Sequence, residues 1–181
     1  MKIMIIGSGG SGKSTFSSRL GPLLNLPVFH LDAYYWKPGW IATPDLEWDE
    51  FLKRLITNED WIIDGNYGRT LEIRMQAADV IIFFDLSPWI TTYRVIKRRI
   101  QYHGKTRPDL NEGCPESLDW TFIKWVWNFR KTRKRGIMDK LLKYKDGRKI
   151  IIITTPKQAD ELLIQIRRFG SRYFEEIENF L

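Results

Sequence analysis

The sequence contains one cysteine, Cys114, and no apolar run that approaches the length of a membrane span. A single thiol excludes an internal disulfide, and its surroundings show no pattern typical of a nucleophile or a metal cluster. The first apolar stretch, residues 3–6, is too short for the core of a signal peptide and is followed by glycines instead of a cleavage site. We therefore expect a cytoplasmic protein with no membrane association.

Internal repeats, low-complexity segments and linkers rich in proline or serine are also lacking. A chain of 181 residues with 43% apolar and 28% charged residues can bury a proper core, so we expect residues 1–181 to form a single domain. The least regular part is residues 103–115, which contain two prolines and two glycines. Segments of this length between helices are typical of mobile functional loops, and we expect a lid-like segment near residues 99–118.

The net charge of +7 is unevenly distributed along the chain. Residues 94–149 contain 17 Lys/Arg and 6 Asp/Glu, a balance of +11, whereas the remainder contains 12 Lys/Arg and 16 Asp/Glu, a balance of −4. A basic block in an otherwise mildly acidic chain indicates a polyanionic ligand on one face. Nucleotide phosphates and a nucleic-acid backbone are the two candidates.

Five short runs rich in Ile, Val and Phe are predicted to be strands, and most are continuous instead of alternating, as expected for a parallel sheet covered on both faces. They are residues 2–6, 27–31, 61–64, 80–85 and 149–154. Predicted helices lie between and after them, at residues 13–20, 45–56, 70–77, 88–102, 116–144, 156–168 and 170–181. Strands that alternate with helices predict an α/β domain of three layers.

Residues 7–14 match the phosphate-binding pattern G-x-x-x-x-G-K-[ST] in full, with a predicted strand before it and a predicted helix after it. The glycines let backbone N–H groups point into an anion-sized nest, and the next helix adds its positive N-terminal end. An incidental glycine-rich turn is the alternative, but the flanking strand and helix argue against it. The predicted nucleotide-binding residues here are Gly7, Ser8, Gly9, Gly10, Ser11, Gly12, Lys13, Ser14 and Thr15.

Two side chains of this loop have specific expected roles. Lys13 is expected to reach the β and γ phosphates as a point charge, and Ser14 is expected to offer its hydroxyl to Mg²⁺. The pattern therefore predicts binding of a nucleoside triphosphate, ATP with magnesium, but it does not indicate what happens to the γ-phosphate.

Three carboxylates, Asp32, Asp64 and Asp85, stand at the ends of predicted strands. The carboxyl ends of strands in an open parallel sheet line the ligand crevice, so a carboxylate there can hold Mg²⁺ or deprotonate an acceptor hydroxyl. The alternative is that each one caps the helix or turn that follows. We favour a cap for Asp85 and a functional role for Asp64, and we leave both interpretations open for Asp32.

Two sets of basic residues flank the irregular segment. Arg94 and Arg98 are four residues apart and share a helical face, and Arg130, Arg133 and Lys134 cluster on the predicted helix 116–144. Such arginines can close over a triphosphate and neutralise charge in the transition state. A solvated basic face is the alternative, and it is our default for the other lysines and arginines of this helix.

The chain contains eight tryptophans, which is a high number for its length. Trp36 and Trp40 surround a Pro-Gly turn just after Asp32, where they can stack on the base or sugar of an acceptor. Trp125, Trp127 and Phe129 are expected to pack their helix onto the core.

Taken together, these motifs resemble P-loop kinases of the adenylate-kinase and nucleoside-kinase kind, and within them bacterial topology modulation proteins of the FlaR type. The resemblance covers nearly the whole chain. It implies ATP as the nucleotide, a three-layer α/β fold with helices on both faces of a five-stranded parallel sheet in the order 2-3-1-4-5, and a lid-like segment. The residues that carry it lie at positions 7–15, 30–40, 61–70, 85–99 and 125–129.

The resemblance also implies roles for single residues. Asp64 and Arg69 lie in a stretch similar to the adenylate-kinase Asp-Gly-Phe-Pro-Arg-Thr with one extra residue, which implies magnesium binding by Asp64 and a hold on the acceptor's phosphate by Arg69. Arg94 is then expected against the adenine and Arg98 on phosphates. Asp32 matches the base for a sugar hydroxyl in uridine-kinase-like sequences. The adenylate-kinase pattern that seats AMP is absent, and so is the guanine-selecting Asn-Lys-x-Asp.

Three functional hypotheses follow from the sequence. The first is a phosphotransferase with a small-molecule acceptor, in which Lys13, Arg98, Arg130 and Arg133 are catalytic charges, Asp32 is the acceptor base, Ser14 and Asp64 hold Mg²⁺, and Asp32, Trp36 and Arg69 bind the acceptor. The second is a nucleic-acid-associated ATPase that affects DNA topology, suggested by the basic block and the family name. The third is a nucleotide-binding regulator without catalysis, which the Lys13–Ser14 pair and Asp64 argue against.

Overall fold

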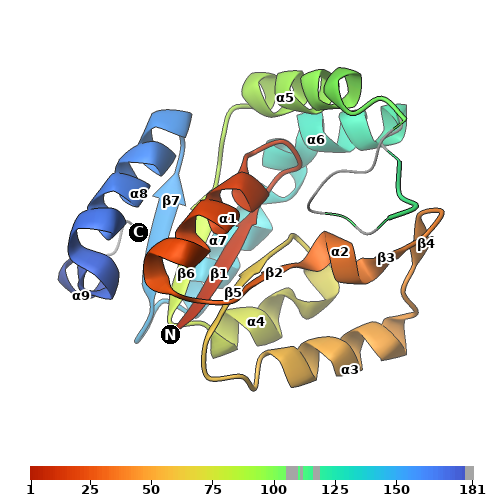
Figure 1. Ribbon diagram of the computed structural model, residues 1–181. Helices are drawn as coiled ribbons and strands as arrows, with labels where there is room; N and C mark the ends of the chain where they lie inside the picture. The colour runs from red at the N-terminus through yellow and green to blue at the C-terminus, as the bar shows by residue number, and fades with distance from the viewer. Residues whose placement is uncertain (105–109, 111, 116–118, 178–181) are drawn as a thin grey trace.

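The computed structural model describes residues 1–104, 110, 112–115 and 119–177. Its centre is a five-stranded parallel sheet (Figure 1). The strands lie in the order β2 (Val28–His30), β5 (Trp61–Asp64), β1 (Lys2–Gly7), β6 (Val80–Phe84) and β7 (Lys149–Ile153). When these five strands are counted along the chain, the order is 2-3-1-4-5, which confirms the predicted sheet.

The strands are continuously apolar because helices cover both faces of the sheet. Alternate residues of β1 enter different cores: Met4 and Ile6 pack in one cluster, and Ile3 and Ile5 pack in the other. Each fully buried aliphatic side chain of this kind stabilises the fold by about 1.5–3 kcal/mol. The side chains of strand residues therefore hold three layers together.

Helices on the two faces come from different parts of the chain (Figure 1). The core that contains Ile3 and Ile5 includes residues of α1 (Lys13–Leu24), α8 (Pro156–Phe169) and α9 (Tyr173–Glu176). The core that contains Met4 and Ile6 includes residues of α3 (Asp45–Leu55), α4 (Leu71–Ala77) and α7 (Lys134–Lys143). Among the described residues, no helix is both long and apolar enough to cross a bilayer.

Two further helices, α5 (Pro88–Gln101) and α6 (Trp120–Thr132), pack against each other beyond the carboxyl ends of the strands (Figure 1). The predicted helix 116–144 is therefore wrong as a single element. It is two helices, α6 and α7, with a break at Arg133, and residues 116–118 lie outside the described residues. The break has a packing reason: α6 places Ile123 and Val126 against α5, whereas α7 places Ile137 and Leu141 in the core beneath the sheet.

Short elements after β2 differ from the prediction. The strand predicted at 27–31 ends at His30, because Leu31 begins the five-residue helix α2 (Leu31–Tyr35). A two-stranded hairpin follows, formed by β3 (Trp36–Lys37) and β4 (Ile41–Ala42), with Gly39 and Trp40 at positive φ in its turn. After β5, the 3₁₀ turn η1 (Gly68–Thr70) leads into α4. Of these pieces, α2 and the hairpin line one rim of a cavity.

Two predicted segments fall partly on residues that are not described. Of the lid-like segment near 99–118, α5 contains residues 99–101, and residues 105–109, 111 and 116–118 lie outside the described ranges. The helix predicted at 170–181 is the turn η2 (Gly170–Arg172) followed by α9, and residues 178–181 are outside the described ranges.

Candidate active site

A cavity of about 1240 Å³ opens at the carboxyl ends of the central strands. The loop between β1 and α1 forms its floor, and α2, the β3–β4 hairpin and residues 64–67 form one wall. Residues of α5 and α6 form the opposite wall. The cavity therefore brings together most of the residues that the sequence marked as functional.

The loop of residues 7–12 depends on glycine for both conformation and space. Gly10 and Gly12 have φ values of +72° and +95°, a region in which a Cβ atom is strained. A Cβ on Gly10 would lie 2.3 Å from the carbonyl oxygen of Thr91, because α5 packs directly on the loop. At the end of the loop, the Lys13 ammonium donates to the Ser8 carbonyl oxygen at 3.0 Å.

Helices α5 and α6 bring side chains over this loop. The Arg94 guanidinium donates to the carbonyl oxygen of Ser11 at 3.3 Å, and Arg98, one turn further along α5, lines the same cavity. From α6, Phe122 approaches Gly9 so closely that a Cβ there would lie 2.7 Å from its ring. Arg94 and Arg98, which were predicted to share a helical face, both line this cavity.

Asp64 is almost completely buried at the end of β5, where it lies in register with His30 on the adjacent strand β2. The Asp64 Oδ2 atom accepts a hydrogen bond from the Ser17 hydroxyl at 2.7 Å and lies 2.9 Å from the His30 Nδ1 atom. Burial disfavours the charged carboxylate, but the hydrogen bonds and charges of His30, Lys13 and Ser17 outweigh it and lower the pKa of Asp64. The Asp64 carboxylate is therefore held ionised beside the loop.

Asp32 lies in the first turn of α2 and lines the cavity. Its Oδ1 atom accepts a 2.6 Å hydrogen bond from the hydroxyl of Tyr67. Burial, followed by the charge and hydrogen bond of Asp32, raises the pKa of Tyr67 far above its ordinary value, so the phenol remains a donor. The ring of Tyr67 is fixed in turn by contacts with Tyr35 and Trp48, at 4.6 and 4.9 Å between ring centroids.

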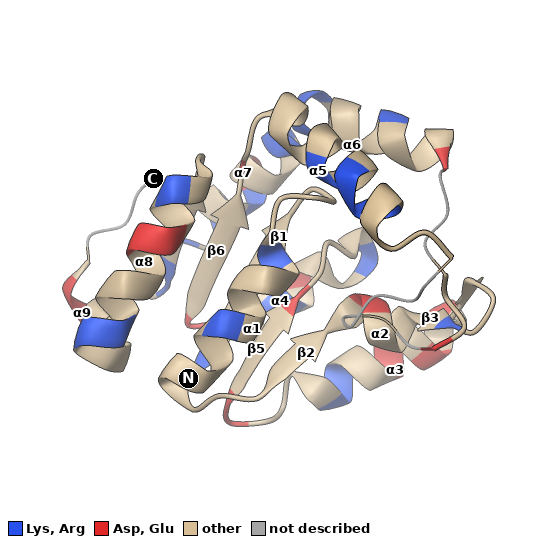
Figure 2. Ribbon diagram, turned by 45° about the horizontal axis from the view of Figure 1, so that its top comes forward, with Lys and Arg blue, Asp and Glu red and all other residues tan. Residues whose placement is uncertain are grey.

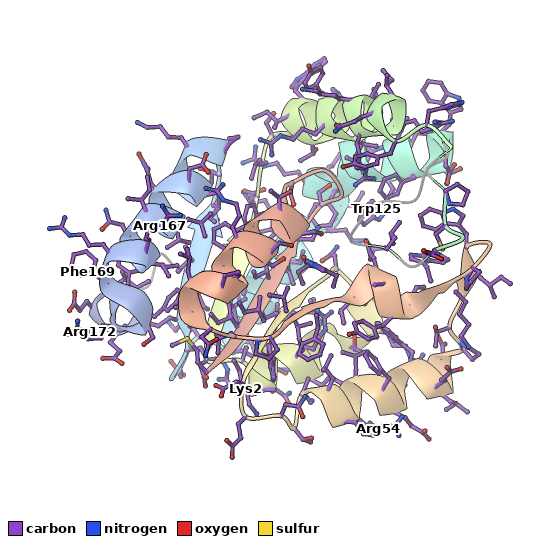
Figure 3. All side chains as sticks on the ribbon, viewed as in Figure 1. Lys2, Arg54, Trp125, Arg167, Phe169 and Arg172 are labelled. Carbon is purple, nitrogen blue, oxygen red and sulfur yellow. The ribbon has the colours of Figure 1, made fainter. Side chains whose placement is uncertain are left out.

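Tryptophans line both sides of the cavity. Trp36 and Trp40 form an edge-to-face pair at 5.5 Å on the hairpin. On the opposite wall, Trp125 extends from the inner side of α6 and stacks on Phe122 at 5.7 Å (Figure 3). Trp125 and Phe129 pack toward the core as expected, but Trp127 does not: it is on the outer face of α6, against Trp89.

Three arginines with predicted roles in the site do not line the cavity. Arg69 lies in the η1 turn and forms ion pairs with Asp45 and Asp49 on α3. Arg130 pairs with Asp85 at 3.0 Å, together with Lys134 at 2.6 Å, so Asp85 anchors the α6–α7 junction instead of capping a helix. The remaining one, Arg133, is an exposed residue at the break between these helices.

Several residues of the site were missed from the sequence. Ser17 lies one turn after Lys13, and His30 lies two residues before Asp32, so their spacing from the predicted residues was the only available signal. Arg74 is fully buried and donates to the carbonyl oxygens of Gly65, Tyr67 and Thr70. It therefore holds in place the backbone that carries Tyr67.

No protein-family model matches the sequence, and neither does any curated protein. Solved structures nevertheless share its fold. Shikimate kinase from Acinetobacter baumannii in complex with shikimate is 12% identical, with a TM-score of 0.58 over 98% of this chain and 95% of that one. Deoxyadenosine kinase from M. mycoides with bound dATP is 16% identical, with a TM-score of 0.52 over 91% of this chain and 98% of that one. The chain therefore has a P-loop kinase fold.

Proposed function

We propose that the protein is an ATP-dependent phosphotransferase that moves the γ-phosphoryl group of ATP to a hydroxyl group of a small acceptor. The observation that carries the proposal is that one cavity connects the phosphate-binding loop to the Asp32 carboxylate. Its volume of about 1240 Å³ exceeds the range of roughly 300–1,000 Å³ that is usual for one small-molecule ligand. It therefore has room for a nucleotide and an acceptor together.

The loop and the residues beside it suit Mg·ATP. Backbone N–H groups of the loop, the N-terminus of α1 and Lys13 are positive groups for phosphate oxygens. Asp64 has an oxygen that could bind magnesium. Both of its hydrogen bonds go to Oδ2, and Oδ1 accepts none from the described residues. Hydroxyl, carboxylate and water oxygens are the ligands that Mg²⁺ takes, so Ser14 and Asp64 fit it. When bound, magnesium supplies positive charge that draws electrons from the transferred phosphate.

Asp32 has the position and chemistry of the acceptor base. In the step, the acceptor hydroxyl oxygen forms a bond to the γ-phosphorus, and the bond from that phosphorus to the β–γ bridging oxygen breaks. ADP leaves with the electron pair, and the hydroxyl proton passes to the Asp32 carboxylate and then to solvent. The Oδ1 atom of Asp32 accepts the hydrogen bond from Tyr67, so Oδ2 is the oxygen that would take the proton.

Arg94 and Arg98 would balance the negative charge that develops on the transferred phosphoryl group. They extend from one face of α5 into the cavity beside the loop. An arginine that reaches this charge contributes on the order of 10³–10⁵ in rate. Arg130 and Arg133 belong to the α6–α7 junction in our proposal, and Arg69 belongs to the ion pairs with α3.

A label-transfer assay tests the proposal. The protein is incubated with ATP labelled at the γ-phosphate, Mg²⁺ and a panel of nucleosides, nucleotides and hydroxylated small molecules. We expect one class of acceptor to gain label, with loss of nucleotide binding in Lys13→Ala and loss of transfer but retained nucleotide binding in Asp32→Asn. Hydrolysis without any labelled acceptor would contradict the transferase.

A different face of the molecule supports a second candidate function, that of a nucleic-acid-associated ATPase such as the topology modulation resemblance implies. Exposed aromatic residues follow one side of α5 and α6, where Trp89 meets Trp127 at 4.6 Å. Neither helix contains an acidic residue, and Figure 2 shows their lysines and arginines. The exposed residues of this face are Trp89, Tyr93, Ile96, Lys97, Ile100, Trp120, Lys124, Trp127 and Lys131.

Rings among lysines suit a single strand of nucleic acid, because bases stack on rings and phosphates pair with the lysines. Two copies of this basic face would repel each other, so it suits nucleic acid better than a second copy of the chain. If this candidate is correct, a labelled oligonucleotide should bind at low salt, lose affinity steeply as salt rises, and bind more weakly to Trp127→Ala. Absence of binding at low salt would remove the second candidate and leave the first unaffected.

A further inference from the structure

Among the residues that the structure describes, the lysines and arginines that line the cavity lie outside the wall around Asp32. This wall comprises α2, the β3–β4 hairpin and residues 64–67, and its charged cavity-lining side chains are Asp32 and Asp64. The cavity-lining lysines and arginines come from other elements: Lys13 and Arg19 from α1, and Arg94 and Arg98 from α5. These lysines and arginines therefore lie on the side of the phosphate loop, where a triphosphate would bind.

Basic residues on or beside this wall are engaged with other partners. His30, which lines the cavity, lies 2.9 Å from Asp64. Arg69 is paired with Asp45 and Asp49, and Lys37 is paired with Glu47 on α3 at 3.0 Å. Arg74 is completely buried and donates to three backbone carbonyl oxygens. An acceptor that carries a phosphate or carboxylate would bring a negative charge next to Asp32, on a wall where no described lysine or arginine lines the cavity, which costs binding free energy.

Among the described residues, aromatic rings, instead of lysines or arginines, line the cavity near Asp32. Trp36, Trp40 and Tyr67 line the cavity on the Asp32 side, and Phe122 and Trp125 line it on the α6 side. Flat, uncharged rings favour a ligand that is itself planar and apolar on its faces. Hydroxyl groups of the same ligand can be reached by the Asp32 carboxylate and by the side chain of Asn66, which also lines the cavity.

We infer that the acceptor is an uncharged, hydroxyl-bearing ring compound of the nucleoside type, and not a nucleotide or a hydroxy acid. This inference rests on the proposed function, because it names the acceptor of that transfer. The acceptor's ring lies among the tryptophans, and its hydroxyl group approaches Asp32. The atoms that move are those of the transfer step already described.

Calorimetry on matched ligand pairs tests the inference. The full chain is saturated with Mg²⁺ and the non-hydrolysable β,γ-imido analogue of ATP, and each pair is then titrated. The probes are the common ribonucleosides and deoxyribonucleosides against their 5′-monophosphates, and shikimate against its methyl ester. We expect the uncharged member of at least one nucleoside pair to bind about 10-fold or more tightly than its charged counterpart, which corresponds to about 1.4 kcal/mol.

Substitutions on the aromatic wall separate a ring contact from a general loss of structure. Trp36→Ala should weaken nucleoside binding about 10-fold, while Trp36→Phe should retain most of it and both variants should bind the ATP analogue normally. Asn66→Arg adds a cation to the wall and should shift the preference toward the 5′-monophosphate. Equal losses for Trp36→Phe and Trp36→Ala would contradict stacking on this ring.

The inference and the proposed function fail in different ways. Tighter binding of the charged members, or no binding of either member in any nucleoside pair, overturns the inference. Label transfer to a phosphorylated acceptor also overturns it while supporting the transferase. Failure of the ATP analogue to bind, by contrast, overturns the proposed function itself.

Discussion

The hydroxyl of Tyr67 donates a 2.6 Å hydrogen bond to the carboxylate of Asp32, although the two residues are 35 positions apart in the chain. This contact joins the ends of two strands, because Asp32 follows β2 and Tyr67 follows β5. Since β2 and β5 are neighbours in the sheet, the topology itself brings the two side chains together. A base that is fixed from one side presents its other oxygen in a constant direction.

Removal of this hydroxyl should affect both catalysis and the stability of the fold. In Tyr67→Phe the ring contacts with Tyr35 and Trp48 remain, and one hydrogen bond to a charged group is lost, at a cost of about 1.5–3 kcal/mol. We expect kcat to fall about 10-fold, with little change in the KM for ATP. Steady-state kinetics and thermal unfolding measure both effects. Tyr34→Phe is the matched control: Tyr34 lies on α2, the helix that carries Asp32, but is half exposed, so this variant should match the unmodified protein.

The lowered pKa of Asp64 predicts a loss of stability in acid. The ordinary pKa of an aspartate is 3.8, and the pKa of Asp64 in the folded protein lies below it. The carboxylate therefore contributes its stabilisation above about pH 4, and this contribution is lost as the pH falls through the folded pKa. Urea unfolding between pH 2 and 7 should show this decline. In Asp64→Asn the decline should be shallower, and an identical pH profile would contradict the assignment.

Arg74 should be needed for stability although it does not line the cavity. Burial, only partly offset by the charges of Tyr67 and Asp64, lowers the pKa of its guanidinium to about 9. Arg74→Met leaves the carbonyl oxygens of Gly65, Tyr67 and Thr70 without this donor, so we expect a loss of roughly 3–5 kcal/mol. Urea unfolding measures it. Arg148→Met, which also removes an arginine bound to backbone carbonyls but at a more exposed site, should cost less.

Two glycines test the importance of close packing at the phosphate loop: Gly10 in the loop and Gly136 in α7. Gly10→Ala places a Cβ 2.3 Å from the Thr91 carbonyl oxygen at a positive φ, so α5 must move away from the loop. We expect calorimetry to detect no nucleotide binding, and we expect the free energy of unfolding to fall by about 1–3 kcal/mol. Gly136→Ala lies within α7 with open space around it and should stabilise the protein by up to about 1 kcal/mol.

The sheet and the phosphate loop could be predicted from the sequence because their signals are local. Continuous apolar runs marked each strand, and the spacing from Gly7 to Ser14 marked the loop. Asp32 and Asp64 could be placed at the site because the carboxyl ends of parallel strands lie at the same edge of the sheet.

The partners of the arginines could not be predicted in the same way. Arg69 lies near Asp64 in sequence, but the η1 turn sends its side chain to α3, and nothing local in the sequence specifies that direction. The break at Arg133 likewise depends on α6 and α7 covering different neighbours. Side chains whose partners are far away in the sequence therefore required the structure.

A comparison of Arg98 with Arg130 separates catalytic charge from structural charge. Arg98 lines the cavity, so Arg98→Met should lower kcat by about 10³ while the free energy of unfolding changes by less than about 1 kcal/mol. Arg130 pairs with the buried carboxylate of Asp85, so Arg130→Met should reduce stability by about 1–3 kcal/mol and leave kcat within a factor of about three. Rate measurements and urea unfolding on both variants would reveal the contrast. If Arg130→Met lost activity at unchanged stability, this arginine would reach the transferred phosphate in the active complex, and the helix α6 that carries it would have to move toward the loop.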